Sequence, residues 1–127
     1  MTDTSPHVLD EVQAERERQT RKHGDQSHLP DGTGPDLVWR DVPMALPLNS
    51  DDVRAGQAAG WAKARCKAAS QNEGGDGSVT FEHILTEEVL EALAESDPIR
   101  LREELIQVAA TAVQWVQTID RRTVSGA

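Results

Sequence analysis

Hydrophobic side chains recur at helical spacing in four segments of the chain, which polar, glycine-rich or proline-rich stretches separate. Residues 6–23 hold a few apolar side chains near their start and then a charged run, which predicts a mostly polar helix. The second segment is rich in alanine and extends to about residue 70. Ser50 is a good N-cap for it, with Asp51 and Asp52 at the positive end of the helix dipole. Both segments are therefore predicted to be helices.

The third and fourth segments are separated by a short polar connection. Thr80 can cap a helix over residues 81–95, and Asp97 followed by Pro98 is a typical start for a fourth helix, which is expected to run to about Arg122. The charge-free interior of the fourth segment covers 15 residues, which is too short to span a membrane. An apolar stripe marks its predicted buried face: Leu101, Leu105, Val108, Ala112, Val116 and Ile119.

A long irregular segment, residues 24–50, is predicted between the first two helices. Its four prolines and three glycines break any regular period. Connections longer than about 12–15 residues inside a compact domain are usually functional or disordered. Embedded apolar side chains indicate that this loop packs against something: Leu37, Val38, Trp39, Met44, Leu46 and Leu48. At the other end of the chain, residues 123–127 are predicted to be a frayed tail.

The composition favours helices as well. A length of 127 residues suits one domain, so we predict a single domain over residues 1–127. Only 3% of the residues are aromatic and tyrosine is absent, so Ala, Leu, Val and Ile must form most of the core. This mixture suits packed helices better than strands. The predicted fold is an all-α bundle of four to five helices.

Charge and cysteine content exclude several functional classes. A net charge of −9 disfavours broad binding to nucleic acids or to anionic membranes. Cys66 is the single cysteine, so no internal disulfide is possible, and a packing role is predicted for it. The first ten residues lack a basic region followed by an apolar run, which predicts a cytoplasmic protein without a signal peptide.

Acidic side chains fall on the apolar face of the third predicted helix. At about 100° per residue, Glu88, Glu91 and Glu95 share the face or flank of its hydrophobic positions. Glutamate is seldom buried without a partner, because an isolated carboxylate in apolar surroundings costs several kcal/mol. Such a cluster needs a cation or several hydrogen-bond donors. Arginine salt bridges at the edge of the bundle are the alternative explanation.

If the third and fourth helices form a hairpin, acids from both can meet. Glu88 and Glu91 are three residues apart, which places their Cβ atoms within about 5–6 Å of each other. Glu104 and Gln107 can then face them across the hairpin, whereas Glu103 points elsewhere. Carboxylate and amide oxygens suit Mg²⁺ or Mn²⁺. The hairpin is therefore a candidate magnesium site.

Two motifs on this hairpin resemble a known family. Residues 87–91, EEVLE, and residues 103–107, EELIQ, are similar to the EExxE and ExxD signature of the MazG-like, all-α nucleoside triphosphate pyrophosphohydrolases. Twelve residues separate Glu91 from Glu104, which fits the family's order and spacing. The similarity extends through residues 81–85 and 108–122, and residues 15–19 and 23–26 resemble the family's first helix and the turn after it.

The resemblance implies a role for each acid at a matching position. Glu88, Glu91 and Glu104 match metal ligands, and Glu87 matches the leading acid that supports the metal or the attacking water. The implied catalytic residues are thus Glu87, Glu88 and Glu91. Gln107 stands where the family has Asp; its amide oxygen can ligate a hard cation but brings no charge, which predicts a weaker site. A ligand set shifted to Glu95 or Asp120, or a loss of activity, is left open.

The implied reaction is the Mg²⁺-dependent hydrolysis of a nucleoside triphosphate to the monophosphate and pyrophosphate. Bridging cations would reverse the negative potential of the carboxylates, polarise the phosphoryl oxygens and activate water. Basic residues must neutralise the outer phosphates. The candidates near the predicted loops are Arg16, Lys22, Arg65 and Lys67. The resemblance also places Gln26 or Asp25 near the base or ribose.

Two other classes of function stay open: a degenerate MazG-like protein that binds nucleotide without hydrolysis, and a helical interaction module with salt-bridged acids. A homodimer or higher homo-oligomer is expected, because the fourth helix is apolar or uncharged around most of its circumference and one hairpin cannot cover it. MazG-like proteins likewise form dimers or higher assemblies. A monomer whose 24–50 loop folds over the exposed face is the alternative.

Overall fold

The computed structural model describes residues 5–39, 53–71 and 79–125, and all regular structure within these ranges is helical. This confirms the all-α class. The described helices are α1 (Ser5–His23), α2 (Ala55–Ser70), α3 (Phe81–Ala94) and α4 (Pro98–Ser125).

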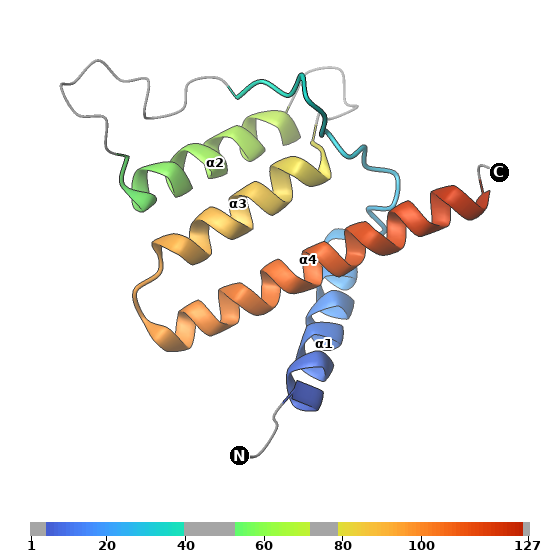
Figure 1. Cartoon of the computed structure of the whole chain (residues 1–127), viewed down its shortest axis with the longest axis horizontal. Helices are drawn as coiled ribbons and strands as arrows, with labels where there is room; N and C mark the ends of the chain where they lie inside the picture. The colour runs from blue at the N-terminus through green and yellow to red at the C-terminus, as the bar shows by residue number, and fades with distance from the viewer. Residues whose placement is uncertain (1–4, 40–52, 72–78, 126–127) are drawn as a thin grey trace.

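The helices form a row with one helix crossing it. α2 packs along α3, and α3 and α4 form the predicted helical hairpin (Figure 1). α1 passes behind α4 in this view and runs steeply across it. In the described part of the chain α4 is the one helix that α1 packs against. α1 therefore does not pack directly against α2 or α3.

The predicted helix boundaries hold at three of four starts. Thr80 is the N-cap of α3, where its Oγ1 accepts a hydrogen bond from the backbone N–H of His83, and α4 begins at Pro98 as expected. α2 begins at Ala55 with Arg54 as its N-cap, four residues later than predicted, and residues 50–52 lie outside the described residues. α4 continues to Ser125, three residues beyond the predicted end at about Arg122, and residues 126–127 lie outside the described residues.

The loop after α1 docks on α3 and α4 through its backbone and one carboxylate. The carbonyl oxygens of Pro30 and Asp31 accept hydrogen bonds from the first two N–H groups of α3, each at 3.0 Å. Asp31 Oδ1 also accepts a 2.7 Å hydrogen bond from Trp115 Nε1. Gly32 has φ of +74°, and a Cβ there would lie 2.3 Å from Thr80 Oγ1, so only glycine permits this approach. The loop thereby satisfies donors that a helix start leaves open.

The apolar side chains of this loop play a smaller part than predicted. Leu37, Val38 and Trp39 are exposed, although the Trp39 ring meets Trp61 of α2 edge-to-face with centroids 5.9 Å apart. Residues 44, 46 and 48 lie outside the described residues. The described loop is therefore held mainly by the hydrogen bonds of Pro30 and Asp31, which cap the N-terminus of α3.

The interior of the described chain is small and partly polar. Phe81 is completely buried and stacks on Trp115 with ring centroids 5.5 Å apart. The other buried apolar side chains are Val12, Ala62, Ala69, Ala92 and Ala110.

The buried face predicted for α4 is wrong for half of its residues. α4 turns Ala110, Thr111, Gln114 and Thr118 toward the fold, and Leu101, Val108 and Ala112 of the predicted apolar stripe are half-buried. The other three members of the stripe are exposed, by 50% for Leu105, 57% for Val116 and 41% for Ile119. Helical periodicity identifies an apolar stripe correctly, but it does not identify which surface covers that stripe.

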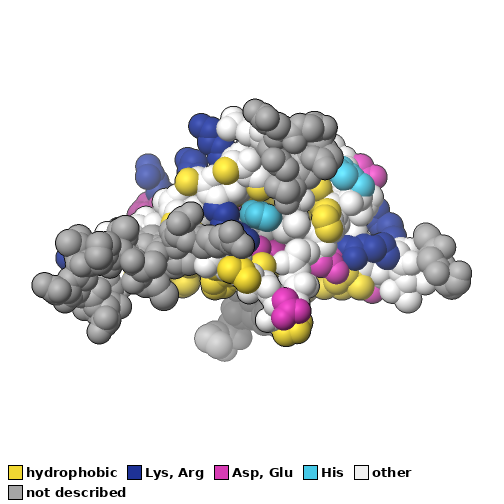
Figure 2. Space-filling view, turned by 90° about the horizontal axis from the view of Figure 1, so that it is seen from above, with side chains coloured by type: hydrophobic (Ala, Val, Ile, Leu, Met, Phe, Trp, Pro, Cys, Tyr) yellow, Lys and Arg dark blue, Asp and Glu magenta, His cyan; other side chains and the backbone are white. Residues whose placement is uncertain are grey.

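The surface mixes charge with apolar groups. In the view from above, basic side chains lie in separate small groups with acidic and hydrophobic side chains between them (Figure 2). Leu9, Leu93 and Ile99 are more than half exposed, in addition to the α4 stripe. Among the described residues, the length and hydropathy that a membrane crossing requires do not occur together in one helix.

Candidate metal centre and adjoining cavity

Three carboxylates from the α3–α4 hairpin converge. Glu88 and Glu91 lie one turn apart on α3, and Glu104 reaches them from the first half of α4. One oxygen from each lies within 4.8 Å of the others. We name these three residues the acidic cluster. The sequence-based prediction that these residues meet is therefore correct.

The acidic cluster is half-buried and short of hydrogen-bond donors. Glu88 Oε2 and Glu104 Oε2 are buried and have no hydrogen-bond partner in the described part of the chain. Burial and the neighbouring Glu91, Glu104 and Glu87 raise the pKa of Glu88 to about 7. Burial and Glu87 likewise raise the pKa of Glu91. Packing these acids together therefore disfavours their ionised forms and leaves them in need of positive charge.

The residues present fit a hard divalent cation. The cluster offers carboxylate oxygens from two rigid helices, and two of those oxygens are unpaired although buried. Mg²⁺ and Mn²⁺ prefer oxygen ligands, and a divalent charge offsets the mutual repulsion of the acids. Lys63 acts against the raised pKa of Glu91, and Lys22 against that of Glu88, but the pKa of each acid stays raised. Neither lysine supplies a hydrogen bond to the two buried oxygens.

Glu87 lies beside the cluster and carries a second contact that the sequence did not indicate. Cys66 of α2 is half-buried, and burial together with the Glu87 carboxylate raises the pKa of its thiol to about 12. The thiol is therefore protonated at neutral pH and lies close enough to the Glu87 carboxylate for its pKa to respond to that charge. The predicted packing role of Cys66 is incomplete, because its side chain also lines the cavity described next.

A cavity of about 360 Å³ adjoins the acidic cluster and is bounded by all four helices. α3 contributes Glu87 and Glu88, α4 contributes Gln107, and α2 contributes Cys66. The wall opposite is one face of α1 and the turn after it: Glu15, Arg18, Gln19, Lys22, His23 and Gln26. Arg18 pairs with the buried Glu15 on this wall, so Lys22 is the cation that the α1 side leaves without an ion pair among these residues. The acidic groups of α3 face this mixed wall across a space large enough for a small polar ligand.

The predicted substrate-binding residues separate into two groups. Lys22 and Gln26 line this cavity. Arg16 lies on another side of α1, where it donates to Gln117 Oε1 at 2.8 Å and lines a different, shallower hollow. Lys67 is exposed on α2 and lines none of the described cavities. The structure therefore brings two of the five candidates together with Glu87 and Glu88.

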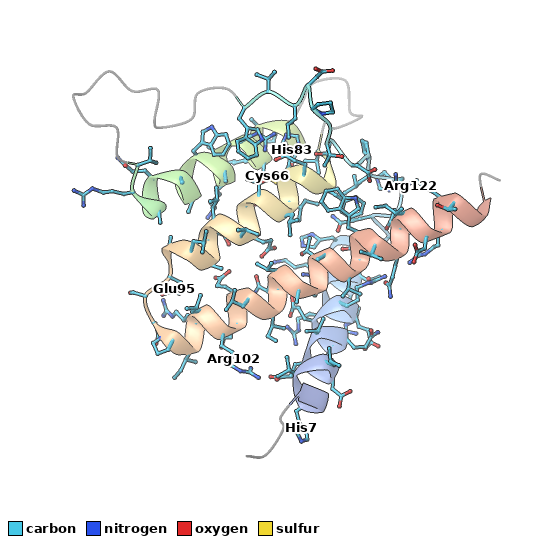
Figure 3. The ribbon with its side chains drawn as sticks, viewed as in Figure 1. His7, Cys66, His83, Glu95, Arg102 and Arg122 are labelled. Atoms are coloured by element: carbon cyan, nitrogen blue, oxygen red, sulfur yellow. The ribbon has the colours of Figure 1, made fainter. Side chains whose placement is uncertain are left out.

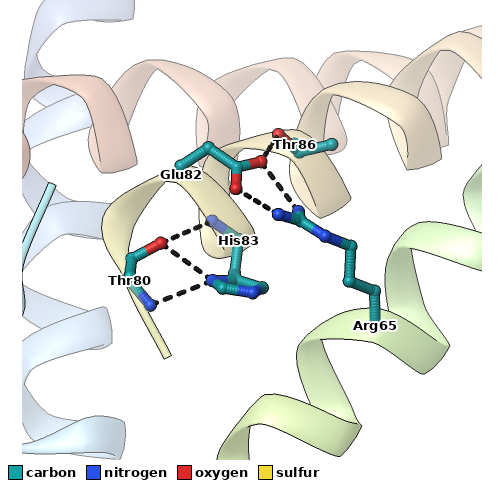
Figure 4. Close-up of polar contacts among 5 residues, drawn as sticks. All are labelled: Arg65, Thr80, Glu82, His83 and Thr86. Atoms are coloured by element: carbon teal, nitrogen blue, oxygen red, sulfur yellow. Dashed lines mark hydrogen bonds and ion pairs between the residues drawn. The ribbon is translucent and has the colours of Figure 1, made fainter. Parts of the chain in front are cut away.

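Arg65, the fifth candidate, joins α2 to α3 (Figure 4). Its guanidinium pairs in bidentate fashion with the buried Glu82, with Nη1 at 2.8 Å from Oε2, and Thr86 Oγ1 donates to the same oxygen at 2.7 Å. Burial acts to raise the pKa of Glu82, but the hydrogen bonds from Arg65 and Thr86 outweigh it and leave the pKa below its usual range. The Arg65 guanidinium also lies over the Trp61 ring. These contacts indicate a structural role.

Arg65→Met is expected to lower the free energy of unfolding by about 3 kcal/mol, because it leaves the Glu82 carboxylate buried without its partner. Chemical denaturation at neutral pH measures this. Lys67→Met is the matched control, since Lys67 is exposed on the same helix, and should change stability by less than about 0.5 kcal/mol. Unchanged stability of Arg65→Met combined with weaker nucleotide binding would instead assign Arg65 to the substrate.

The alternative ligands left open by the sequence lie elsewhere. Glu95 is the C-cap of α3, at the connection to α4, where its Oε2 accepts a hydrogen bond from the Asp97 N–H (Figure 3). Asp120 is exposed and borders a hollow with Arg16. Glu103 is exposed, as predicted. Neither Glu95 nor Asp120 belongs to the acidic cluster that the described residues form.

Gln107 is the residue that departs from the family pattern and that the sequence offers as a fourth ligand. It is half-buried and lines the cavity with Glu87 and Glu88. Its backbone oxygen accepts a hydrogen bond from Gln19 Nε2.

Sequence reasoning missed Arg18, Gln19 and His23, although Glu15, Arg18, Gln19 and Lys22 share one helical face. That spacing was the available signal.

Fold and site together define an all-α bundle whose hairpin holds a cluster of oxygen ligands beside a charged cavity. No family model, curated protein or solved structure matches this chain. The likeness to the MazG-like family therefore rests on the two acidic motifs, their spacing and the helices that carry them.

Proposed function

We propose that this protein is a Mg²⁺-dependent nucleoside triphosphate pyrophosphohydrolase of the MazG-like type, with Mn²⁺ as an alternative cation. The reaction joins a water oxygen to the α-phosphorus, breaks the α–β phosphate bond and releases the nucleoside monophosphate and pyrophosphate. The observation that carries this proposal is the acidic cluster, in which two buried carboxylate oxygens lack hydrogen-bond partners among the described residues. The resemblance of the two acidic motifs to the MazG-like signature supports the α–β phosphate bond as the one that is cleaved.

The acidic cluster would hold the cation, and Gln107 borders the same space as an uncharged oxygen donor. When bound, the cation supplies polarisation of the phosphoryl oxygens and a lowered pKa for a water molecule. Glu87 is the candidate to take up the proton of the attacking water, because it lies beside the cluster and lines the cavity. The protonated Cys66 thiol lines the same cavity beside Glu87 and brings no charge of its own to the site.

The α1 wall is suited to the outer phosphates. Lys22 interacts favourably with Glu88 across the cavity, and His23 and Arg18, which also pairs with Glu15, line the same wall. Positive charge there would neutralise the developing negative charge on pyrophosphate as it leaves. A triphosphate would therefore lie between the cation at the hairpin and the basic groups of α1.

The proposed assembly is a homodimer formed by the α4 stripe. Leu105, Val116 and Ile119 lie open although they belong to the most regular apolar stripe of the chain. The described part of the 24–50 loop does not cover them, because it docks at Pro30 and Asp31 on the start of α3 and meets α2 through Trp39. A second copy related by a two-fold axis would cover the stripe with the same surface.

A pyrophosphate-release assay tests the proposed reaction. The wild-type protein is incubated with Mg²⁺ and, separately, with EDTA, over a panel of ribonucleoside, deoxyribonucleoside and modified triphosphates. Stoichiometric monophosphate and pyrophosphate, formed with Mg²⁺ alone, is the expected result. If the protein binds nucleotide but forms no product, the non-hydrolysing MazG-like alternative is favoured. If it neither binds nucleotide nor forms product, the helical interaction module is the alternative that remains.

Mg²⁺ is expected to raise the melting temperature. A ligand at ten times its Kd stabilises the folded state by about 1.4 kcal/mol, or roughly 4–8 °C for a domain of this size. Differential scanning calorimetry with and without millimolar MgCl₂ measures the shift, with NaCl of equal ionic strength as the reference. Glu104→Gln should lose the shift and the adjacent, exposed Glu103→Gln should keep it. An unchanged melting temperature, with and without nucleotide, would count against the site.

A further inference from the structure

Gln19 lines the cavity from α1 and is half-buried. Its Nε2 donates to the backbone oxygen of Gln107 at 3.4 Å and to Thr111 Oγ1 at 3.3 Å, both on α4. The carbonyl oxygen of Gln107 can only accept a hydrogen bond, so it identifies the amide nitrogen and fixes the orientation of the side chain. The nitrogen side of the Gln19 amide is therefore held by α4.

The other half of this amide has no partner. Gln19 Oε1 is buried and accepts no hydrogen bond from any described residue. A buried acceptor left without a donor costs about 1–3 kcal/mol. Gln19 Oε1, Glu88 Oε2 and Glu104 Oε2 are the three buried side-chain oxygens in this condition within the described ranges, and Gln19 and Glu88 both line the same cavity.

The chemistry of the missing partner differs between the two walls. The carboxylates of Glu88 and Glu104 attract a cation, whereas an uncharged amide oxygen needs an N–H or O–H donor. Phosphate oxygens are acceptors and cannot supply one, so the phosphate chain of a nucleotide is excluded from this position. The nucleoside end remains, which offers N–H groups on the base and O–H groups on the sugar.

We propose that Gln19 is a specificity-determining residue whose Oε1 accepts a hydrogen bond from an N–H group of the nucleobase. This inference rests on the proposed function, because it takes a nucleotide as the occupant of the cavity. The base is favoured over the sugar because its donor lies on a rigid ring edge, which a fixed amide recognises without further loss of side-chain freedom. A site built to hydrogen-bond an N–H rejects analogues that lack it, since its own buried group then stays unpaired.

The role of Gln19 is tested by comparing the affinity of each nucleotide with that of an analogue whose base N–H is replaced by N-methyl. Calorimetry compares UTP with 3-methyl-UTP, GTP with 1-methyl-GTP, and ATP and CTP with their N,N-dimethylamino analogues. All are used as α,β-methylene triphosphates, which the proposed hydrolysis cannot cleave, in Mg²⁺ on the full chain. For the preferred nucleotide, methylation should weaken binding to the wild-type protein by about 10–100-fold, as expected for loss of one buried hydrogen bond. In Gln19→Met the ratio should fall to about 1, because the acceptor is gone.

Three controls separate Gln19 from general damage. Inorganic tripolyphosphate has no base, and its affinity should be the same in wild type and Gln19→Met. Gln13→Met alters an exposed glutamine of the same helix and should keep the methylation ratio. The 2′,3′-dideoxy form of the preferred nucleotide tests the sugar; if that form, and not the methylated base, weakens wild-type binding, a hydroxyl donor replaces the base donor and the proposal is wrong.

The remaining outcomes distinguish this inference from the proposed function. A wild-type protein that binds parent and methylated nucleotides equally overturns the role of Gln19 while the hydrolysis proposal stands, and that comparison needs no variant. The same ratio in wild type and Gln19→Met also overturns it. A wild-type protein that binds no nucleotide overturns both.

Discussion

Glu91→Gln is expected to lower the rate of pyrophosphate release by about 10²–10³-fold, the loss typical when one charge-stabilising group is removed from an active site. Glu91 belongs to the acidic cluster, and the amide that replaces it has almost the same shape but no charge. The cation would therefore be bound more weakly and positioned less firmly. Steady-state kinetics over a Mg²⁺ titration measures the loss, and excess Mg²⁺ should restore part of it.

The same substitution should leave the protein folded. The pKa of Glu91 is raised by burial and by Glu87, so the Glu91 carboxylate is held at a cost in the protein without cation. Removing that charge should keep or raise the melting temperature measured in EDTA, because functional acids are commonly placed at the expense of stability. Glu103→Gln, exposed on α4, should retain activity. A Glu91→Gln protein with normal turnover would exclude the acidic cluster as the catalytic centre.

The local parts of this fold could be predicted from sequence because they depend on neighbouring residues. Thr80 and Pro98 mark helix starts through hydrogen bonds and dihedral angles within a few residues of themselves. The convergence of Glu88, Glu91 and Glu104 also follows locally, since one turn of helix and a short hairpin determine it. These are the elements on which the metal-site prediction depended.

Contacts between distant segments could not be predicted in the same way. The Arg65–Glu82 pair and the Gln19–Thr111 hydrogen bond join helices whose relative placement depends on how each packs. Arg65 was a reasonable phosphate ligand by position alone, because sequence does not reveal that a buried acid already holds it. Gln19 carried no signal beyond its place on the α1 face, since its significance lies in an oxygen left unpaired after packing.

The face of α4 shows a further limit of periodicity. The pattern identifies Leu105, Val116 and Ile119 as one apolar stripe, yet the folded chain buries Thr111 and Thr118 instead. An apolar stripe in the sequence indicates that this surface is buried in the working protein. It does not indicate whether the same chain or a second copy buries it. The open stripe is therefore the strongest argument for the proposed homodimer, because it reconciles the pattern with the structure.

Val116→Glu is expected to convert the dimer to a monomer, so that the mass measured by light scattering falls from twice to once the chain mass of 13.9 kDa. Val116 is 57% exposed on the single chain and lies between Leu105 and Ile119 along the stripe. A carboxylate buried in a dimer interface without a partner costs several kcal/mol, which weakens association by about 10³-fold or more. Sedimentation over a range of micromolar concentrations measures the change in Kd.

The exposed position of Val116 makes the result decisive. If the protein is a monomer, Glu at an exposed site changes the free energy of unfolding by less than about 0.5 kcal/mol and leaves the mass as it was. Ala64→Glu adds the same charge at an exposed position of α2 and should leave a dimer intact. A wild-type mass of one chain at these concentrations, with full pyrophosphate release, would refute the dimer and leave the stripe uncovered in the working protein. A wild-type dimer that Val116→Glu dissociates, while the Mg²⁺-dependent rise in melting temperature persists, would place the interface on α4 and show that cation binding is complete within one chain.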